Sequence, residues 1–175
     1  MSMVYKFVVI SSEEEDFLRE FELDENNTLL DFHNIMQEEL EYDRSQMASF
    51  FTTSKKWEKE EEFTLFEMGA NTTPMDEVIV DDIIIEENQK LLYVFDMFNE
   101  RTLFIECIGP VSPVEGRQYP VCTRSQGKPP QQVIFSNFTK VKARIDDDDD
   151  VPDDFIDDSD PDLSAFENMD DYEDT

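Results

Sequence analysis

The stretch "NNTLLDFHNIMQEELEY", residues 26–42, decides the fold because it holds the clearest helix signal of the 175-residue chain. Thr28 is a suitable N-cap, and Asp31, three positions later, completes the weaker aspartate form of a capping box. Apolar side chains recur at helical spacing, at Leu29, Phe32, Met36 and Leu40. The opposite side carries Gln37, Glu38 and Glu41. This pattern predicts a helix that packs its apolar side on a sheet and turns the polar side to solvent.

His33, the single histidine, lies at the margin of this apolar stripe, four residues after Leu29 and three before Met36. No Cys, second His or spaced set of carboxylates stands near it, so it lacks the surroundings of a metal ligand. Buried polar groups normally find hydrogen-bond partners. We therefore expect a structural, hydrogen-bonded role for His33, and the sequence indicates no bound metal or other cofactor.

Segments rich in aromatic and branched residues lie on both sides of the helix. Residues 5–10 and 17–23 alternate apolar and polar side chains and predict a hairpin. Further strands are expected at residues 48–54, 62–68, 90–96 and 102–108. The predicted fold class is α+β, with a mixed, mainly antiparallel sheet packed against one principal helix and followed by a disordered acidic tail.

Three segments between and after these strands are less regular. Residues 78–88 fit either a strand or a short helical turn. Trp57 lies in a charged hairpin loop expected at residues 55–62, where it either packs back on the sheet or is exposed. Residues 109–132 concentrate Pro and Gly, which favours turns and extended chain over regular elements.

Charge narrows the choice of partner. The formal net charge is -30, and residues 146–175 hold 16 acidic and no basic residues. Direct binding to nucleic acid or to an anionic membrane is disfavoured, whereas a protein with a basic surface is attracted. The one concentrated basic surface expected is the basic island, a set of six cations just before the tail: Arg117, Arg124, Lys128, Lys140, Lys142 and Arg144. The oligomeric state is left open.

Signals for export or membrane insertion are missing from the sequence. The first residues carry a single lysine before a few apolar residues and no small-residue cleavage site, and no apolar run approaches the roughly 20 residues that span a bilayer. A cytoplasmic location is therefore expected. Cys107 alternates with apolar residues on an expected strand, so we predict a buried free thiol and no disulfide with Cys122.

The acidic tail divides into two parts. Residues 146–150 form a like-charge block that serves as a spacer. Leu163, Phe166 and Met169 then recur at threes after Asp160 and Pro161, as in a segment that folds on a docking groove. Such a segment docks on the basic island or on a separate basic protein; alternatively the tail is a disordered solubilising appendage. The expected organisation is a domain at residues 1–145 and a mostly disordered tail at residues 146–175.

The order of these segments resembles the plasmid pRiA4b ORF-3-like family over residues 4–132. "FHNIMQ" corresponds to the family's helix motif, "LLYVFDMFNE" to a strand motif and "YPVCTRSQGKPPQQ" to the last motif. The matching positions are His33, Gln37, Tyr93, Asp96, Cys122, Gly127, Pro129 and Pro130. The chain departs from the family at "DMFNERTL", which lacks the usual glycine, tryptophan and second histidine, and it lacks the later cysteines. The resemblance implies a fold and no established activity.

Three functions are compatible with this sequence. The first is a non-enzymatic interaction or regulatory module with an acidic C-terminal arm. The alternative is a nucleic-acid-associated factor whose basic segment, residues 117–144, is masked by the phosphate-mimicking tail. The third is a degenerate enzyme, which requires a pocket that gathers His33, Asp96 or Cys122.

Overall fold

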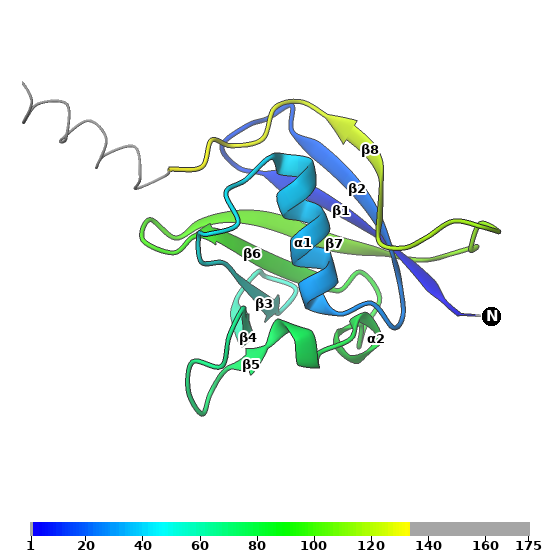
Figure 1. Cartoon of the computed structure of the whole chain (residues 1–175), viewed down its shortest axis with the longest axis horizontal. Helices are drawn as coiled ribbons and strands as arrows, with labels where there is room; N and C mark the ends of the chain where they lie inside the picture. Colours follow the sequence, from blue (N-terminus) through cyan, green and yellow to red (C-terminus); the bar gives the residue numbers. More distant parts are fainter. Residues whose placement is uncertain (1, 134–175) are drawn as a thin grey trace, which may run out of the picture. The chain divides into compact units, whose positions relative to one another are not determined.

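The computed structural model of the chain describes residues 2–133 (Figure 1). In chain order its elements are β1 (Val4–Ser11), β2 (Leu18–Asp24), α1 (Leu29–Leu40), β3 (Ser49–Thr53), β4 (Lys59–Thr64), β5 (Thr73–Pro74), the 3-10 turn η1 (Met75–Glu77), α2 (Val80–Ile83), β6 (Lys90–Asp96), β7 (Arg101–Val111) and β8 (Val121–Gln126). Within residues 2–133 the strands form one eight-stranded sheet in the order β5-β4-β3-β6-β7-β1-β2-β8.

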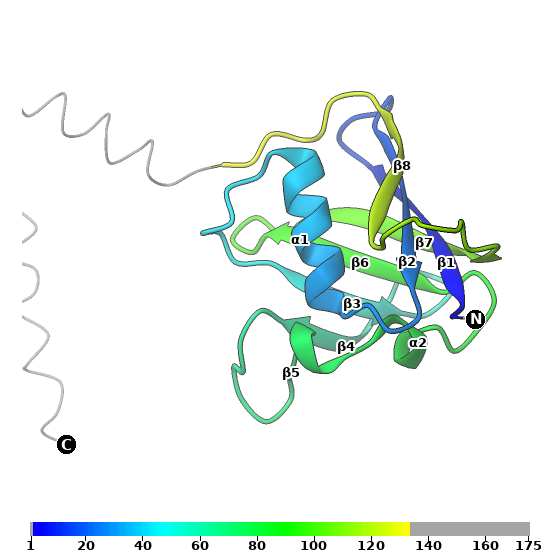
Figure 2. The same ribbon diagram turned by 45° about the vertical axis from the view of Figure 1, so that its right-hand side comes forward.

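The pairing of these strands confirms the predicted fold class. β5 runs parallel to β4, and the other neighbouring strands are antiparallel. Figures 1 and 2 both show α1, the principal helix, lying across one face of the sheet. The disordered tail that completes the predicted fold class lies outside the described residues.

The capping box predicted at the start of α1 is formed. The Asp31 backbone N–H donates to Thr28 Oγ1 at 3.1 Å, and the Thr28 N–H donates to Asp31 Oδ2 at 2.9 Å. The predicted apolar stripe of Leu29, Phe32, Met36 and Leu40 is buried. The helix ends at Glu41, whose φ of 54° is left-handed.

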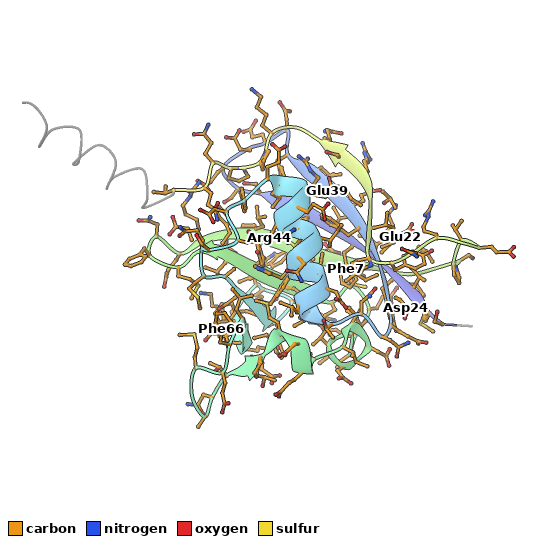
Figure 3. All side chains as sticks on the ribbon, in the orientation of Figure 1. Phe7, Glu22, Asp24, Glu39, Arg44 and Phe66 are labelled. Carbon is orange, nitrogen blue, oxygen red and sulfur yellow. The ribbon has the colours of Figure 1, made fainter. Side chains whose placement is uncertain are left out.

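The core is centred on the ring of Phe32. Its centroid lies 5.2 Å from that of Phe7 on β1, 5.6 Å from that of Phe21 on β2 and 5.5 Å from that of Phe50 on β3. Figure 3 labels Phe7 beside α1, where the helix crosses the sheet. One helix side chain thus joins three strands, which accounts for the dependence of the fold on this stretch of sequence.

The structure corrects three predictions about individual segments and decides one alternative that the sequence left open. Gln37, expected on the solvent side of α1, is 2% exposed, because the buried side of the helix is wider than the apolar stripe. β8 forms within the Pro- and Gly-rich stretch, where β2 supplies the pairing that local sequence does not. β4 begins at Lys59, inside the expected loop, and ends at Thr64. Residues 78–88 contain α2, so the helical-turn alternative is correct.

The sheet face that points away from α1 carries a row of apolar side chains in cross-strand register. Leu18 on β2 is opposite Ile10 on β1, which is opposite Phe104 on β7. The row continues through Leu92 on β6 to Phe51 on β3. The Trp57 ring packs edge-on against Phe104 with centroids 5.1 Å apart, so Trp57 packs back on the sheet.

Candidate functional site

His33, Tyr93 and Gln37, three of the family-motif residues, form one buried hydrogen-bonded chain between α1 and β6. Gln37 Nε2 donates to Tyr93 Oη at 2.6 Å, and Tyr93 Oη lies 2.8 Å from His33 Nδ1. Because Tyr93 accepts from Gln37, its own proton is free to be donated to Nδ1, which assigns the proton of the neutral imidazole to Nε2. The chain ties the helix to the sheet through two side chains one helical turn apart.

The charge state of this chain is fixed by burial. Burial, followed by the positive charge of Arg44, lowers the pKa of His33 to about 4, and burial raises the pKa of Tyr93. Both groups are therefore neutral at pH 7. Gln37 Oε1 is buried and has no hydrogen-bond partner. The arrangement can hold the helix in register, but it presents no titrating group to solvent at neutral pH.

Asp96 caps the turn between β6 and β7. Its Oδ1 accepts the backbone N–H groups of Phe98 at 3.2 Å and Asn99 at 3.1 Å, and its Oδ2 accepts Asn99 Nδ2 at 2.9 Å. Partial burial pushes the pKa of Asp96 upward, but these hydrogen bonds and the charge of Arg101 outweigh it, so the pKa is lowered. Asp96 is thus an ionised turn residue.

The last family motif contains β8 and continues as a strap, residues 127–132, toward the end of α1. Gly127 has a φ of 70°, and a Cβ there would lie 2.3 Å from the backbone oxygen of Asp16. The carbonyl of Pro130, which follows Pro129, accepts the Tyr42 hydroxyl at 2.5 Å. Burial raises the pKa of Cys122, on β8, to about 11, and the carboxylate of Glu39 adds to this, so its thiol is protonated.

Arg19, on β2, binds the start of this strap, a contact that the sequence did not reveal. It is 4% exposed, and its guanidinium donates to the carbonyls of Gln126 at 2.6 Å and Gly127 at 3.0 Å. The group also stacks over Phe17, 4.8 Å from the ring centroid. Arg19 shares the period-two face of Phe17, Phe21 and Leu23, so the alternation on β2 places it on the buried face. Its residue type favours exposure instead, and the distant carbonyls that accept its hydrogen bonds allow the burial.

The structure does not bring His33, Asp96 and Cys122 together. His33 contacts β6, Asp96 ends β6, and Cys122 lies on β8, with β7, β1 and β2 between the two strands. Within residues 2–133 there is no group of three or more His, Cys, Asp or Glu side chains that could hold a metal ion. None of the helices in this range is both long and apolar enough to span a membrane.

The basic island is partly neutralised where the structure describes it. Arg117 Nη1 lies 2.9 Å from Glu22, and Arg124 Nη1 lies 3.8 Å from Glu20. Lys128 lines a surface hollow at the end of α1. The other members of the island and the tail-docking residues lie outside the described range: Lys140, Lys142, Arg144, Leu163, Phe166 and Met169.

Two lysines lie over aromatic rings near the turn between β3 and β4. Lys90 Nζ lies 4.7 Å from the Trp57 ring centroid and donates to the Lys55 carbonyl at 2.9 Å. Lys59 Nζ lies 4.4 Å from the Phe51 ring centroid. Lys90 reaches this aromatic cluster from β6, whereas Lys59 reaches it from β4.

A groove of about 440 Å³, here named the α2 groove, lies between the start of β1, the end of β7 and the loop that follows α2. Its apolar lining comes from Met3, Tyr5, Ile84, Ile85 and Pro110. Ile85 is 79% exposed. The sequence did not predict this groove, since it depends on the packing of three segments that are far apart in the chain.

The architecture of one mixed sheet crossed by one principal helix is shared with a solved structure. A protein of unknown function, MM3350, from Methanosarcina mazei Go1 superposes with a TM-score of 0.57 and 21% sequence identity over 71% of this chain and 70% of that chain. At this identity the likeness shows the fold alone.

The plasmid pRiA4b ORF-3-like protein family matches residues 4–166, and the chain belongs to this family. The match runs past residue 132, where the resemblance of the motifs ended. Comparison with curated proteins gives no match.

Proposed function

We propose that this chain is a non-enzymatic interaction module with an acidic C-terminal arm and that its partner is a protein with a basic surface. The observation that carries this proposal is the distribution of charge. Residues 2–133 contain 28 acidic and 11 basic side chains, and the arm at residues 146–175 adds 16 acidic side chains and no basic one. Fields of this size steer oppositely charged proteins into encounter and repel phosphate backbones.

The hydrogen bonds and charge states of the candidate reactive residues support a non-enzymatic role. His33 is neutral within a closed hydrogen-bonded chain, Asp96 caps a turn and the Cys122 thiol is protonated. A nucleophile needs a base within hydrogen-bond reach, and a general acid or base needs a pKa near the working pH. Each of these side chains instead has a partner that serves the fold.

The arm is the part of the chain that differs most from its surroundings in composition. Three of its apolar side chains, Leu163, Phe166 and Met169, favour contact with a groove, whereas its carboxylates favour a basic rim. In this proposal the arm contributes to partner binding through both kinds of side chain, and the domain supplies the remaining contacts.

The experiment is capture of cytoplasmic proteins by the immobilised full-length chain, compared with a chain that ends at residue 145. This shortened chain retains every described helix and strand. We expect a basic protein to be captured at low salt and released as salt rises, with weaker capture by the shortened chain. Absence of any salt-sensitive basic partner would refute the proposal, and stronger capture after shortening would show that the arm competes with the partner.

A matched variant separates charge from side-chain recognition within the arm. The triple substitution L163S/F166S/M169S leaves all 16 carboxylates of residues 146–175 in place. If the apolar side chains dock, this variant captures the partner as weakly as the shortened chain does. Capture equal to that of the unmodified chain would reduce the arm to a charged appendage.

A further inference from the structure

The floor of the α2 groove combines apolar side chains with main chain that is open on one side. β6 begins at Lys90, opposite Glu106 of β7, whereas β7 continues to Val111. Residues 109–111 of β7 therefore have β1 as their single strand neighbour among the described residues, and Pro110 offers a carbonyl but no N–H to an added strand. A Cβ at Gly109 would meet nothing within 4 Å, so the space over the face of the strand at this residue is open.

Ile85 stands out on the wall of the groove. Its 79% exposure contrasts with neighbouring Ile84, which packs against the core. A large aliphatic side chain held next to an apolar groove gains free energy when a ligand covers it, at about 25 cal/mol for each Å² removed from water. Ile85, Met3 and Pro110 thus form an apolar surface without a partner inside the described range.

The border of the groove is acidic. Glu86 and Glu87 line it, as does Tyr5. The Tyr5 hydroxyl donates a hydrogen bond of 2.9 Å to Asp81 Oδ1 on α2. Residues 60–89 contain ten carboxylates and no lysine or arginine. Burial, followed by the hydrogen bond to Asp81 and its charge, raises the pKa of Tyr5 to about 12, in agreement with negative surroundings.

Among residues 2–133, the ion pair at this border comes from Lys55. Lys55 Nζ lies 3.8 Å from Glu86 Oε2, and the Lys55 side chain is 80% exposed. An exposed pair of this length contributes little, and the lysine is easily displaced by a cation of a ligand. The carboxylates therefore remain available to positively charged side chains.

We propose that the α2 groove binds an extended peptide segment of a partner protein in which lysine or arginine residues flank large aliphatic side chains. The aliphatic side chains cover Ile85 and the groove floor, the cations meet Glu86 and Glu87, and the peptide backbone follows the open edge of β7. Edge pairing supplies affinity, and alternate side chains supply selectivity. This inference rests on the proposed function, because it names the site and the chemistry of the basic partner.

The test uses two labelled probes and the full-length chain. The first probe is acetyl-Lys-Lys-Ile-Leu-Lys-Lys-amide, and the second, acetyl-Lys-Lys-Ser-Ser-Lys-Lys-amide, has the same charge without the aliphatic pair. Fluorescence anisotropy gives both dissociation constants. We expect the first probe to bind about tenfold more tightly, which corresponds to partial burial of two aliphatic side chains.

Substitutions on the protein test whether Ile85, Glu86 and Glu87 account for the difference in affinity between the two probes. I85S is expected to weaken binding of the Ile-Leu probe about tenfold and to leave the Ser-Ser probe unchanged. E86Q/E87Q is expected to weaken both probes about two- to fivefold, an effect that disappears at high salt. The matched controls are F66S and E60Q/E61Q.

These controls are exposed and lie away from the groove. Phe66 is 66% exposed, and Figure 3 shows it on the opposite side of the molecule from Asp24. Asp24 marks the side of the molecule that carries the groove. The N–H of the next residue, Glu25, donates to the carbonyl of Met3, a groove residue, at 2.8 Å. Glu60 and Glu61 lie on β4, near the far edge of the sheet.

Two results would overturn the inference. The first is equal affinity for the two probes, which would reduce binding to unspecific charge attraction. The second is an I85S variant that binds the Ile-Leu probe as tightly as F66S does. If the basic partner is still captured by I85S and by E86Q/E87Q, the proposed function stands and the groove is not its site. If no basic partner is captured by any variant, the proposed function itself fails.

Discussion

Replacement of Gly127 by alanine tests whether the strap after β8 needs a conformation that only glycine adopts. At φ 70°, a Cβ on residue 127 would lie 2.3 Å from the Asp16 oxygen and 2.9 Å from the Phe17 nitrogen. Both are backbone atoms, so no side-chain rotation relieves the overlap. The left-handed conformation costs alanine about 1 kcal/mol, and overpacking typically costs about 1–3 kcal/mol. We expect G127A to lower the free energy of unfolding by about 2–4 kcal/mol.

Gly116 provides the matched control because its φ is 77° and a Cβ there would meet nothing within 4 Å. G116A carries the conformational cost alone, about 1 kcal/mol. Urea unfolding followed by far-ultraviolet circular dichroism and by the fluorescence of Trp57, the single tryptophan, measures both losses. Equal losses in the two variants would refute the argument, because the contact with Asp16 would then carry no cost.

Three further predictions concern α1 and its hydrogen bonds. Y93F removes the hydroxyl that joins Gln37 to His33. Because two buried polar groups lose their partner, the free energy of unfolding measured in urea is expected to fall by about 2 kcal/mol. An unchanged midpoint would contradict the hydrogen-bonded chain. Unfolded His33 binds a proton near pH 6.5 and folded His33 only near pH 4, so stability falls as pH drops through this window. Between pH 7.5 and pH 4.5 this residue accounts for about 2–3 kcal/mol of lost stability, and H33Q is expected to show a pH dependence smaller by that amount. T28A removes the N-cap bond to Asp31 and is expected to cost about 1 kcal/mol, measured in the same urea assay, whereas an unchanged stability would mean that the cap is dispensable.

Local patterns predicted those elements whose partners are close in sequence or whose burial follows a simple period. The Thr28 cap, the apolar stripe of α1 and the hairpin of β1 and β2 all belong to this class. β8 escaped prediction because its pairing with β2 joins residues about a hundred positions apart, and no local signal marks such a strand. The Pro and Gly residues on both sides of β8 predicted turns instead.

Buried polar residues were the second source of error. Gln37 was predicted on the solvent side of α1, but its hydrogen bond to Tyr93 holds it in the core. The carbonyls of Gln126 and Gly127 that pair with buried Arg19 likewise lie far away in the sequence. A polar residue is predicted to be exposed unless its partner is known. The α2 groove was missed for a related reason, since its lining comes from β1, β7 and the loop after α2.

The residues that reveal the family are occupied with holding the fold, and this directs the search for function elsewhere on the molecule. His33, Gln37 and Tyr93 fix α1 on β6, and Gly127 and Pro130 fasten the strap across the end of the helix. These hydrogen bonds and contacts join elements within the described residues, and among the groups of the His33–Tyr93–Gln37 chain only Gln37 Oε1 is buried without a hydrogen-bond partner. In this chain the named motif residues thus contribute to the packing of α1 on the sheet. Surfaces without an internal task, such as exposed Ile85 with its acidic border, are the places where a partner gains contacts that the fold itself does not use.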